Sequence, residues 1–156
     1  MTPPVICIVG KSKSARTELM EALILELRSR GLSVGALKHH IHGDFEIDIE
    51  GKDTWKYANA GADTVAISSS LKFAIIKKVK TEMDIDEIRE RYFRDNDVVL
   101  ADGFTLSDKP RIIVGREDID MFKRGCSVMA VVDETGIMDK ISCIAERVVK
   151  YLKSFN

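Results

Sequence analysis

Residues 5–17 decide the fold of this chain: Val5-Ile6-Cys7-Ile8-Val9-Gly10-Lys11-Ser12-Lys13-Ser14-Ala15-Arg16-Thr17. The first five residues are apolar and mostly β-branched, which predicts a strand covered on both faces. Gly10 ends this run, and a helical pattern starts near Thr17. Strand, loop and helix in this order predict a phosphate-binding loop of the pattern G-x-x-x-x-G-K-[S/T], in which backbone N–H groups and a helix N-terminus hold a polyphosphate.

The loop departs from that pattern at two positions. Gly10 and Thr17 match, but Ala15 replaces the second glycine and Arg16 replaces the lysine. A negative φ tolerates the methyl group of Ala15, and Arg16 keeps the positive charge on a planar fork instead of a compact ammonium. A register with Gly10 as the second glycine is rejected, because it would place the loop inside the strand. We expect nucleotide binding with weak or absent hydrolysis; the alternative is a strand-to-helix turn without a ligand.

The composition predicts a single domain, residues 1–156, with a full hydrophobic core. The chain has 156 residues, of which 45% are hydrophobic, and it contains no internal repeat or linker. Its 24 basic and 25 acidic residues are spread along the chain and give a formal net charge of −1. A nucleic-acid or membrane surface is therefore not expected. Without a secretory pattern or a membrane-spanning apolar run, the chain is predicted to be cytoplasmic.

Strands and helices alternate along the chain. Apolar residues at helical spacing follow the loop and stop near Gly31. We expect further strands at 33–38, 63–68, 72–77, 97–102, 112–114 and 128–132, and further helices near 52–60, from Asp84, and up to Leu152. The short connection between 63–68 and 72–77 predicts a hairpin, so the sheet should be mixed. The chain is therefore predicted to be an α/β, three-layer P-loop NTPase-like domain with a mostly parallel sheet and some antiparallel strands.

Asp102 lies where ligands of such sheets bind, beyond the carboxyl end of a strand. It ends the apolar run 97–102 and precedes Gly103 and Phe104. Nucleotide hydrolases place a carboxylate at this position to hold Mg²⁺ directly or through water. A strand that ends in aspartate is a weak signal alone, and the upstream loop strengthens it.

All three histidines of the chain lie within Lys38-His39-His40-Ile41-His42. The longer segment from His39 to Asp53 is polar and punctuated by glycine, which predicts a functional loop at the carboxyl edge of the sheet. The histidines could ligate zinc or nickel, but a closed site needs four ligands and no cysteine lies nearby, so another chain or a bound ligand would have to complete it. They could instead contact phosphate or another anion, or belong to a polar loop without a ligand.

The order of these motifs resembles the molybdopterin-guanine dinucleotide biosynthesis protein B (MobB) family. The resemblance rests on the loop up to Thr17, on Lys38-His39-His40-x-His42, on Asp48-x-x-Gly51-Lys52-Asp53-Thr54, on Ala60-Gly61-Ala62-Asp63 and on Asp97-x-x-Leu100-x-Asp102-Gly103-Phe104. It extends from the N-terminus to about Val114. The middle motifs together are specific, whereas the loop is shared with many NTPases.

This resemblance implies a homodimeric P-loop protein that binds GTP with Mg²⁺ and hydrolyses it slowly at most. It implies assistance to the guanylyltransferase that joins GMP to molybdopterin, and presentation of the cofactor to apo-molybdoenzymes, with molybdopterin a further candidate ligand. Carried onto this sequence, the residues that hold phosphates would be Gly10, Lys11, Ser12, Lys13, Ser14, Ala15, Arg16 and Thr17. Thr17 and Asp102 would flank Mg²⁺. The facing wall would consist of Lys38, His39, His40, His42, Asp48 and Asp53.

Two departures from the family pattern concern the phosphates and the metal. The family usually has G-K-T where this chain has Ala15-Arg16-Thr17, and often glutamate where Asp102 stands. Lys11 occupies the place of a signature lysine that some related NTPases use across a dimer, so Lys11 or Lys13 is a candidate to restore the missing charge.

Two other classes of function stay open. One is a nucleotide-dependent metal-delivery protein that uses His39, His40 and His42, and the other is an interaction module that has lost its nucleotide. The sequence has no N-K-x-D element to select guanine, and Asp133, after the strand 128–132, is a candidate contact to the base.

Overall fold

The computed structural model describes residues 2–155, and the chain divides into two compact units. The first unit comprises Met1–His40 and Asp84–Asn156, and the second comprises Ile41–Met83. Each unit is described by itself.

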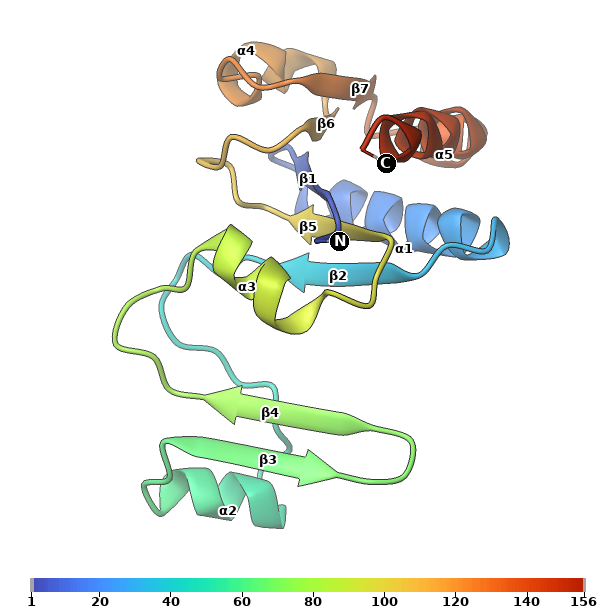
Figure 1. The fold of residues 1–156 in the computed structure, drawn as a ribbon. Coiled ribbons are helices and arrows are strands. Elements are labelled where there is room, and N and C mark those ends of the chain that lie inside the picture. The colour runs from blue at the N-terminus through green and yellow to red at the C-terminus, as the bar shows by residue number, and fades with distance from the viewer. Residues whose placement is uncertain (1, 156) are drawn as a thin grey trace. The chain divides into compact units, whose positions relative to one another are not determined.

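A five-stranded parallel sheet forms the centre of the first unit (Figure 1). Its strands are β1 (Val5–Val9), β2 (Val34–Lys38), β5 (Val98–Asp102), β6 (Arg111–Val114) and β7 (Val128–Val132), in the order β2-β5-β1-β6-β7. All four strand pairs are parallel. Every residue of β1 and β5 is buried, as their continuous apolar sequences predict.

Helices cover both faces of this sheet and confirm the three-layer prediction. On one face, α1 (Lys13–Ser29) and α5 (Ile137–Lys153) pack Leu19, Leu23, Leu27, Ile144 and Val148 against the strands. On the other face, α3 (Ile85–Tyr92) contributes Ile85, and α4 (Ile119–Phe122), which follows a 3₁₀ turn at Arg116–Asp118, contributes Phe122. No helix within residues 2–155 is both long and apolar enough to cross a membrane.

Helix α1 begins earlier than its apolar pattern indicates. Its first residue is Lys13, whereas the spacing of leucines predicted a start near Thr17. Ser12 is the N-cap, and its side chain accepts a hydrogen bond from the backbone N–H of Ala15. Serine is a favourable N-cap, so this local signal starts the helix before the first apolar residue of its buried face.

The second unit holds an antiparallel hairpin of β3 (Thr64–Ser68) and β4 (Phe73–Lys77), together with α2 (Asp53–Asn59). The hairpin prediction is confirmed, but the prediction of one mixed sheet is wrong, because β3 and β4 form a two-stranded sheet of their own. Val65 of β3 is buried. The cross-strand pairs Ala66 with Ile75 and Ser68 with Phe73 occupy the opposite face. There Ile75 is 42% and Phe73 67% exposed.

Gly10 packs directly against the end of β6, and this contact yields a test of the fold. A Cβ atom at Gly10 would lie 2.2 Å from the carbonyl oxygen of Val114, and the φ of Gly10 is +149°. We expect Gly10→Ala to lower the free energy of unfolding by about 3 kcal/mol or more, because two backbones would have to separate. Urea denaturation followed by circular dichroism measures this loss.

Gly31→Ala is the matched control for this clash. Gly31 also has a positive φ, +84°, but nothing lies within 4 Å of its would-be Cβ. This variant should lose only about 1 kcal/mol, from backbone strain. Equal losses in the two variants would contradict the assigned contact between Gly10 and Val114.

Candidate functional site

The candidate site lies at the carboxyl edge of the parallel sheet, where β1, β2 and β5 end. Asp102, the last residue of β5, is in register with Ile8 of β1 on one side and with Lys38 of β2 on the other. Gly10 follows β1 directly and opens the loop to α1. The parallel pairing thus brings together Gly10, Lys38 and Asp102, as the sequence predicted for the ends of parallel strands.

Two cations hold the side chain of Asp102, which is 7% exposed. The Arg16 Nε atom donates to Oδ1 at 2.8 Å, and the Lys38 Nζ atom donates to Oδ2 at 2.5 Å. Burial raises the pKa of the Asp102 carboxyl group, but the hydrogen bonds and charges of Lys38 and Arg16 outweigh it and hold the pKa below its ordinary value. The three side chains together carry one net positive charge, which suits an anion.

Arg16 also binds the backbone of the loop that follows Gly10. Its Nη1 group donates to the carbonyl oxygen of Gly10 and, at 3.5 Å, to that of Lys11. Residue 16 therefore does face the loop, in the place of the usual lysine. Ala15 lies within α1 and is buried in the core, so this position needs no glycine.

Asp118 is a partner of the loop that the sequence analysis missed. Its side chain is fully buried, the backbone N–H of Lys11 donates to Oδ2 at 3.0 Å, and Lys11 Nζ lies 2.8 Å from Oδ1. The hydrogen bond from Lys11 is the main cause that lowers the pKa of Asp118. The sequence feature that could have indicated Asp118 is the acidic pair Glu117-Asp118, which comes soon after the strand 111–114. Lys11 is thus paired within its own chain.

The expected magnesium ligands do not fit Mg²⁺ in this arrangement. Both oxygens of Asp102 accept hydrogen bonds from cations. The Thr17 hydroxyl donates to the carbonyl oxygen of Lys13 at 3.0 Å. Mg²⁺ requires oxygen ligands in a near-octahedral shell, so it would have to displace Arg16, Lys38 or both from the carboxylate.

His39 is held against the motif that follows Asp102. Its backbone N–H donates to the carbonyl oxygen of Asp102 at 3.0 Å, and its ring stacks on Phe104 with centroids 4.6 Å apart. A Cβ at Gly103 would lie 3.1 Å from the Cβ of His39, which explains the glycine between Asp102 and Phe104. The predicted proximity of His39 to this edge is therefore observed.

The other predicted wall residues lie at the end of the first unit and in the second unit. His40 is exposed at the end of the first unit. In the second unit, His42 is exposed, Asp48 accepts from the backbone N–H of Ile49 at 2.8 Å, and Asp53 lies in the first turn of α2. Within residues 2–155, no group of three His, Cys, Asp or Glu side chains is arranged to hold a metal ion. The facing wall remains a prediction.

Asp133, the candidate contact to a base, is held by two cations after β7. Arg116 Nε lies 2.7 Å from Oδ1, and Lys140 Nζ lies 3.0 Å from Oδ2. Hydrogen bonds from Lys140 and Arg116 lower the pKa of this carboxyl group. A guanine that bound Asp133 would share this carboxylate with Arg116 and Lys140.

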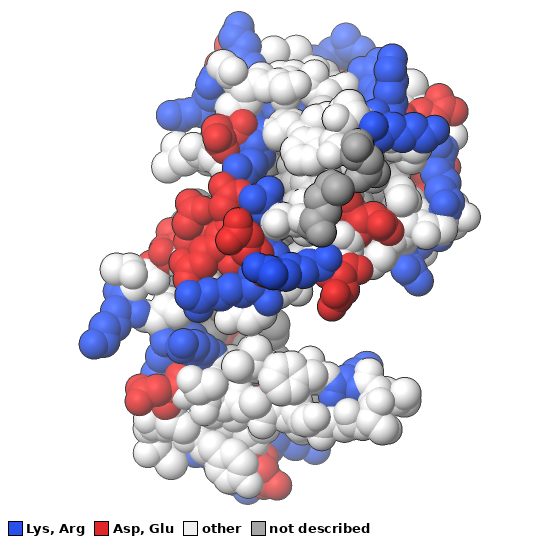
Figure 2. Space-filling model, viewed as in Figure 1, with Lys and Arg blue, Asp and Glu red and all other residues white. Residues whose placement is uncertain are grey.

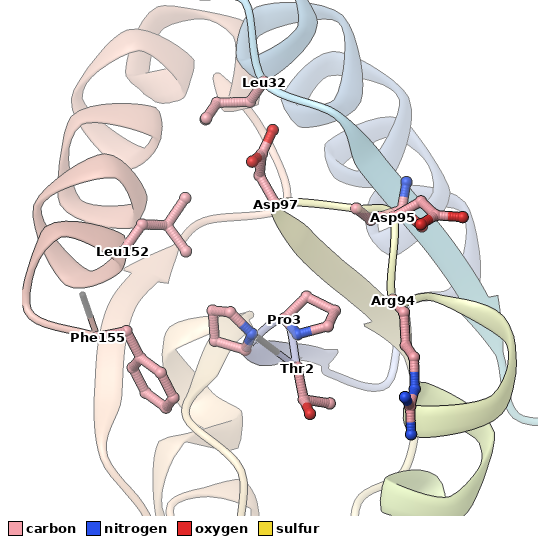
Figure 3. A pocket seen from close by; sticks show the side chains of 10 residues that line it. Thr2, Pro3, Leu32, Arg94, Asp95, Asp97, Leu152 and Phe155 are labelled. Atoms are coloured by element: carbon pink, nitrogen blue, oxygen red, sulfur yellow. The ribbon is translucent and has the colours of Figure 1, made fainter.

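A pocket of about 280 Å³ lies at the opposite edge of the sheet (Figure 3). Among its lining residues, Pro4 immediately precedes β1 and Asp97 immediately precedes β5, while Leu152 and Phe155 come from the C-terminal end. It therefore sits at the amino ends of the strands. None of the predicted site residues lines it.

Comparison with protein families gives a match over residues 5–134 to the family model MobB, described as molybdopterin guanine dinucleotide synthesis protein B. The chain is 32% identical over 117 residues to a molybdopterin-guanine dinucleotide biosynthesis adapter protein of Haemophilus influenzae, covering 74% of this chain and 65% of that protein. It is 27% identical over 117 residues to the molybdopterin-guanine dinucleotide biosynthesis adapter protein of Escherichia coli, covering 73% of this chain and 66% of that protein. The chain thus spans about two thirds of the length of these relatives.

Solved structures agree with this match. A crystal structure of a molybdopterin-guanine biosynthesis protein B superimposes with a TM-score of 0.78 and 34% identity, covering 96% of this chain and 99% of that one. The crystal structure of MobB from Bacillus subtilis gives a TM-score of 0.70 and 28% identity, covering 83% of this chain and 79% of that one. The first of these likenesses extends over nearly the whole of both chains.

The pairing of Asp102 predicts a loss of stability in acid. Because the pKa of Asp102 is lowered in the folded protein, the unfolded chain takes up this proton first as the pH falls below about 4. The stabilisation is complete above that pH and is lost as the pH falls through the lowered pKa. In Asp102→Asn, the free energy of unfolding should decline less steeply in this range, as urea titrations at successive pH values measure.

Gly31→Ala serves as the control, because it changes stability without changing an ionisable group. It should keep the acid slope of the wild type. An Asp102→Asn variant with an unchanged slope would contradict the ion pairs of Asp102.

Proposed function

Because this chain belongs to the MobB family, molybdopterin guanine dinucleotide synthesis protein B, we propose that it is a GTP-binding adapter protein in the biosynthesis of molybdopterin guanine dinucleotide. One observation carries the nucleotide part of this proposal. Arg16 and Lys38, far apart in the sequence, meet on Asp102 beside the loop that follows Gly10. This is the edge of an α/β sheet where phosphates bind.

GTP is the nucleotide that the family suggests, since the relatives are named for a guanine dinucleotide. The net positive charge of Arg16, Lys38 and Asp102 favours a polyphosphate, and the guanidinium group suits bidentate contact with phosphate oxygens. The side chain of Lys38 is 53% exposed and so remains accessible to a ligand. Molybdopterin, which also carries a phosphate, is a further candidate for the same charges.

Hydrolysis should be slow at most. Catalysis of phosphoryl transfer depends on a positioned lysine, a metal ion and an oriented water. Here Arg16 stands in place of the lysine and is anchored on Asp102. The protein would therefore hold the nucleotide instead of consuming it, as an adapter does.

The proposed partners are the guanylyltransferase that joins GMP to molybdopterin and the apo-molybdoenzymes that receive the product, in the cytoplasm. The relatives are named adapter proteins, which supports a role in contact with other proteins. Formation of the guanine dinucleotide by a purified guanylyltransferase, with and without this protein, tests the role. No change in yield or in transfer to an apo-molybdoenzyme would overturn it.

The second unit supports a homodimer. Phe73, Ile75 and Ala66 share one face of the β3–β4 hairpin, and all three are exposed in the single chain. The side of the hairpin visible in Figure 2 carries few charged side chains. Exposed apolar faces of this kind mark protein–protein contacts, and a two-stranded sheet offers unpaired edges to a second copy.

Binding of GTP predicts stabilisation against heat. Ligand present at about 100 times its dissociation constant should stabilise the fold by ~2.7 kcal/mol. Arg16→Ala should weaken the affinity by about tenfold or more, because it removes a charge-assisted contact to phosphate. Thermal-shift assays and isothermal titration with GTP, ATP and GMP measure both effects.

Arg28→Ala is the matched control, because Arg28 is an exposed arginine of the same helix. Its affinity for GTP should equal that of the wild type. Absence of any thermal shift with every nucleotide would favour the interaction module that has lost its nucleotide.

The dimer predicts a molar mass of twice 17.5 kDa in solution. Ile75→Lys should give a monomer, because a charge would then lie in the apolar contact. Size-exclusion chromatography with light scattering measures the mass. Leu25→Lys, at a 71% exposed leucine of α1 in the first unit, should remain dimeric. A monomeric wild type, or a dimeric Ile75→Lys variant, would contradict the hairpin interface.

A further inference from the structure

The carboxylate expected to hold Mg²⁺ is already neutralised by the chain itself. Each oxygen of Asp102 receives its own cation, Arg16 on Oδ1 and Lys38 on Oδ2. In nucleotide hydrolases a bare carboxylate at this position repels phosphate, and the metal ion bridges the two. In this chain the carboxylate of Asp102 is already paired with two cations, so no metal ion is needed to prevent its repulsion of phosphate.

We propose that this protein binds the phosphates of its nucleotide without a divalent metal ion, with Arg16 and Lys38 supplying the positive charge. The inference rests on the proposed binding of GTP and deepens it, because it names what replaces Mg²⁺. A metal ion brought to Asp102 would meet a cation already bound to each carboxylate oxygen, and would have to displace at least one of them.

The geometry of Arg16 favours this role over that of a lysine. Its Nε atom binds Asp102, while Nη1 binds the carbonyl oxygens of Gly10 and Lys11. Among residues 2–155, its Nη2 group has no protein acceptor and can donate to phosphate. A lysine ammonium group lacks this planar fork of donors. It would therefore not hold the carboxylate, the loop and a phosphate in the same fixed directions.

Lys38 supplies the second charge from a different strand. The register of β2 with β5 places it opposite Asp102, so its position is fixed by backbone pairing. Its Nζ atom has three donors, one of which is used by Oδ2. The remaining donors on a half-exposed side chain are available to a phosphate.

Titration of the full chain with GTP in EDTA and again in excess Mg²⁺ tests the inference. In the wild type, the two dissociation constants should differ by less than about threefold. In Arg16→Lys, one oxygen of Asp102 is released, so the affinity should become dependent on Mg²⁺ by about tenfold or more. Arg28→Lys, an exposed position of the same helix, should behave as the wild type.

The variant Asp102→Asn distinguishes two roles of Asp102, the positioning of Arg16 and Lys38 and the binding of Mg²⁺. If Asp102 only positions Arg16 and Lys38, this variant should change the affinity for GTP by the same factor in Mg²⁺ and in EDTA, because the positioning of the two cations does not depend on a metal ion. If Asp102 holds Mg²⁺, the variant should lose affinity in Mg²⁺ and not in EDTA.

Three outcomes are distinguishable. Similar affinity of the wild type in both buffers supports metal-free binding. Binding by the wild type that requires Mg²⁺ overturns this inference and leaves the proposed function intact. Failure to bind in both buffers overturns the proposed binding of GTP itself.

Discussion

The candidate site depends on one buried carboxylate, Asp102, held between a guanidinium group and an ammonium group. Without Asp102, Arg16 and Lys38 would repel each other at the carboxyl edge of the sheet. Without the cations, a buried negative charge would lie unpaired, which is costly. Because Arg16 also binds the carbonyl oxygen of Gly10, the same carboxylate connects β5, β2 and the loop after β1.

The two units divide the properties expected of an adapter. The first unit has a complete core on both faces of its sheet and brings Arg16, Lys38 and Asp102 together at one edge. The second unit is too small to bury its hairpin, so β4 remains exposed along its whole length. A small two-stranded sheet is marginal alone and gains stability from a partner. The proposed nucleotide site and the proposed protein contact therefore fall on different parts of the chain.

Much of the fold follows from local patterns in the sequence. The apolar runs at 5–9 and 98–102 become the two fully buried strands, and the leucine spacing after the loop places the buried face of α1. Apolar periodicity reports burial, but it does not report helix caps or strand partners. For that reason the start of α1 at Lys13 and the separation of β3–β4 from the main sheet were not found.

The sequence alone determined that a loop after Gly10, Lys38 and Asp102 lie at the same edge, because consecutive parallel strands end on one side of a sheet. It also determined the charge at residue 16. Only the tertiary structure decided that Asp102 binds both cations and that Lys11 binds Asp118. These pairs join residues 64 to 107 positions apart, and side-chain contacts over such distances depend on strand order and packing, which no local pattern encodes.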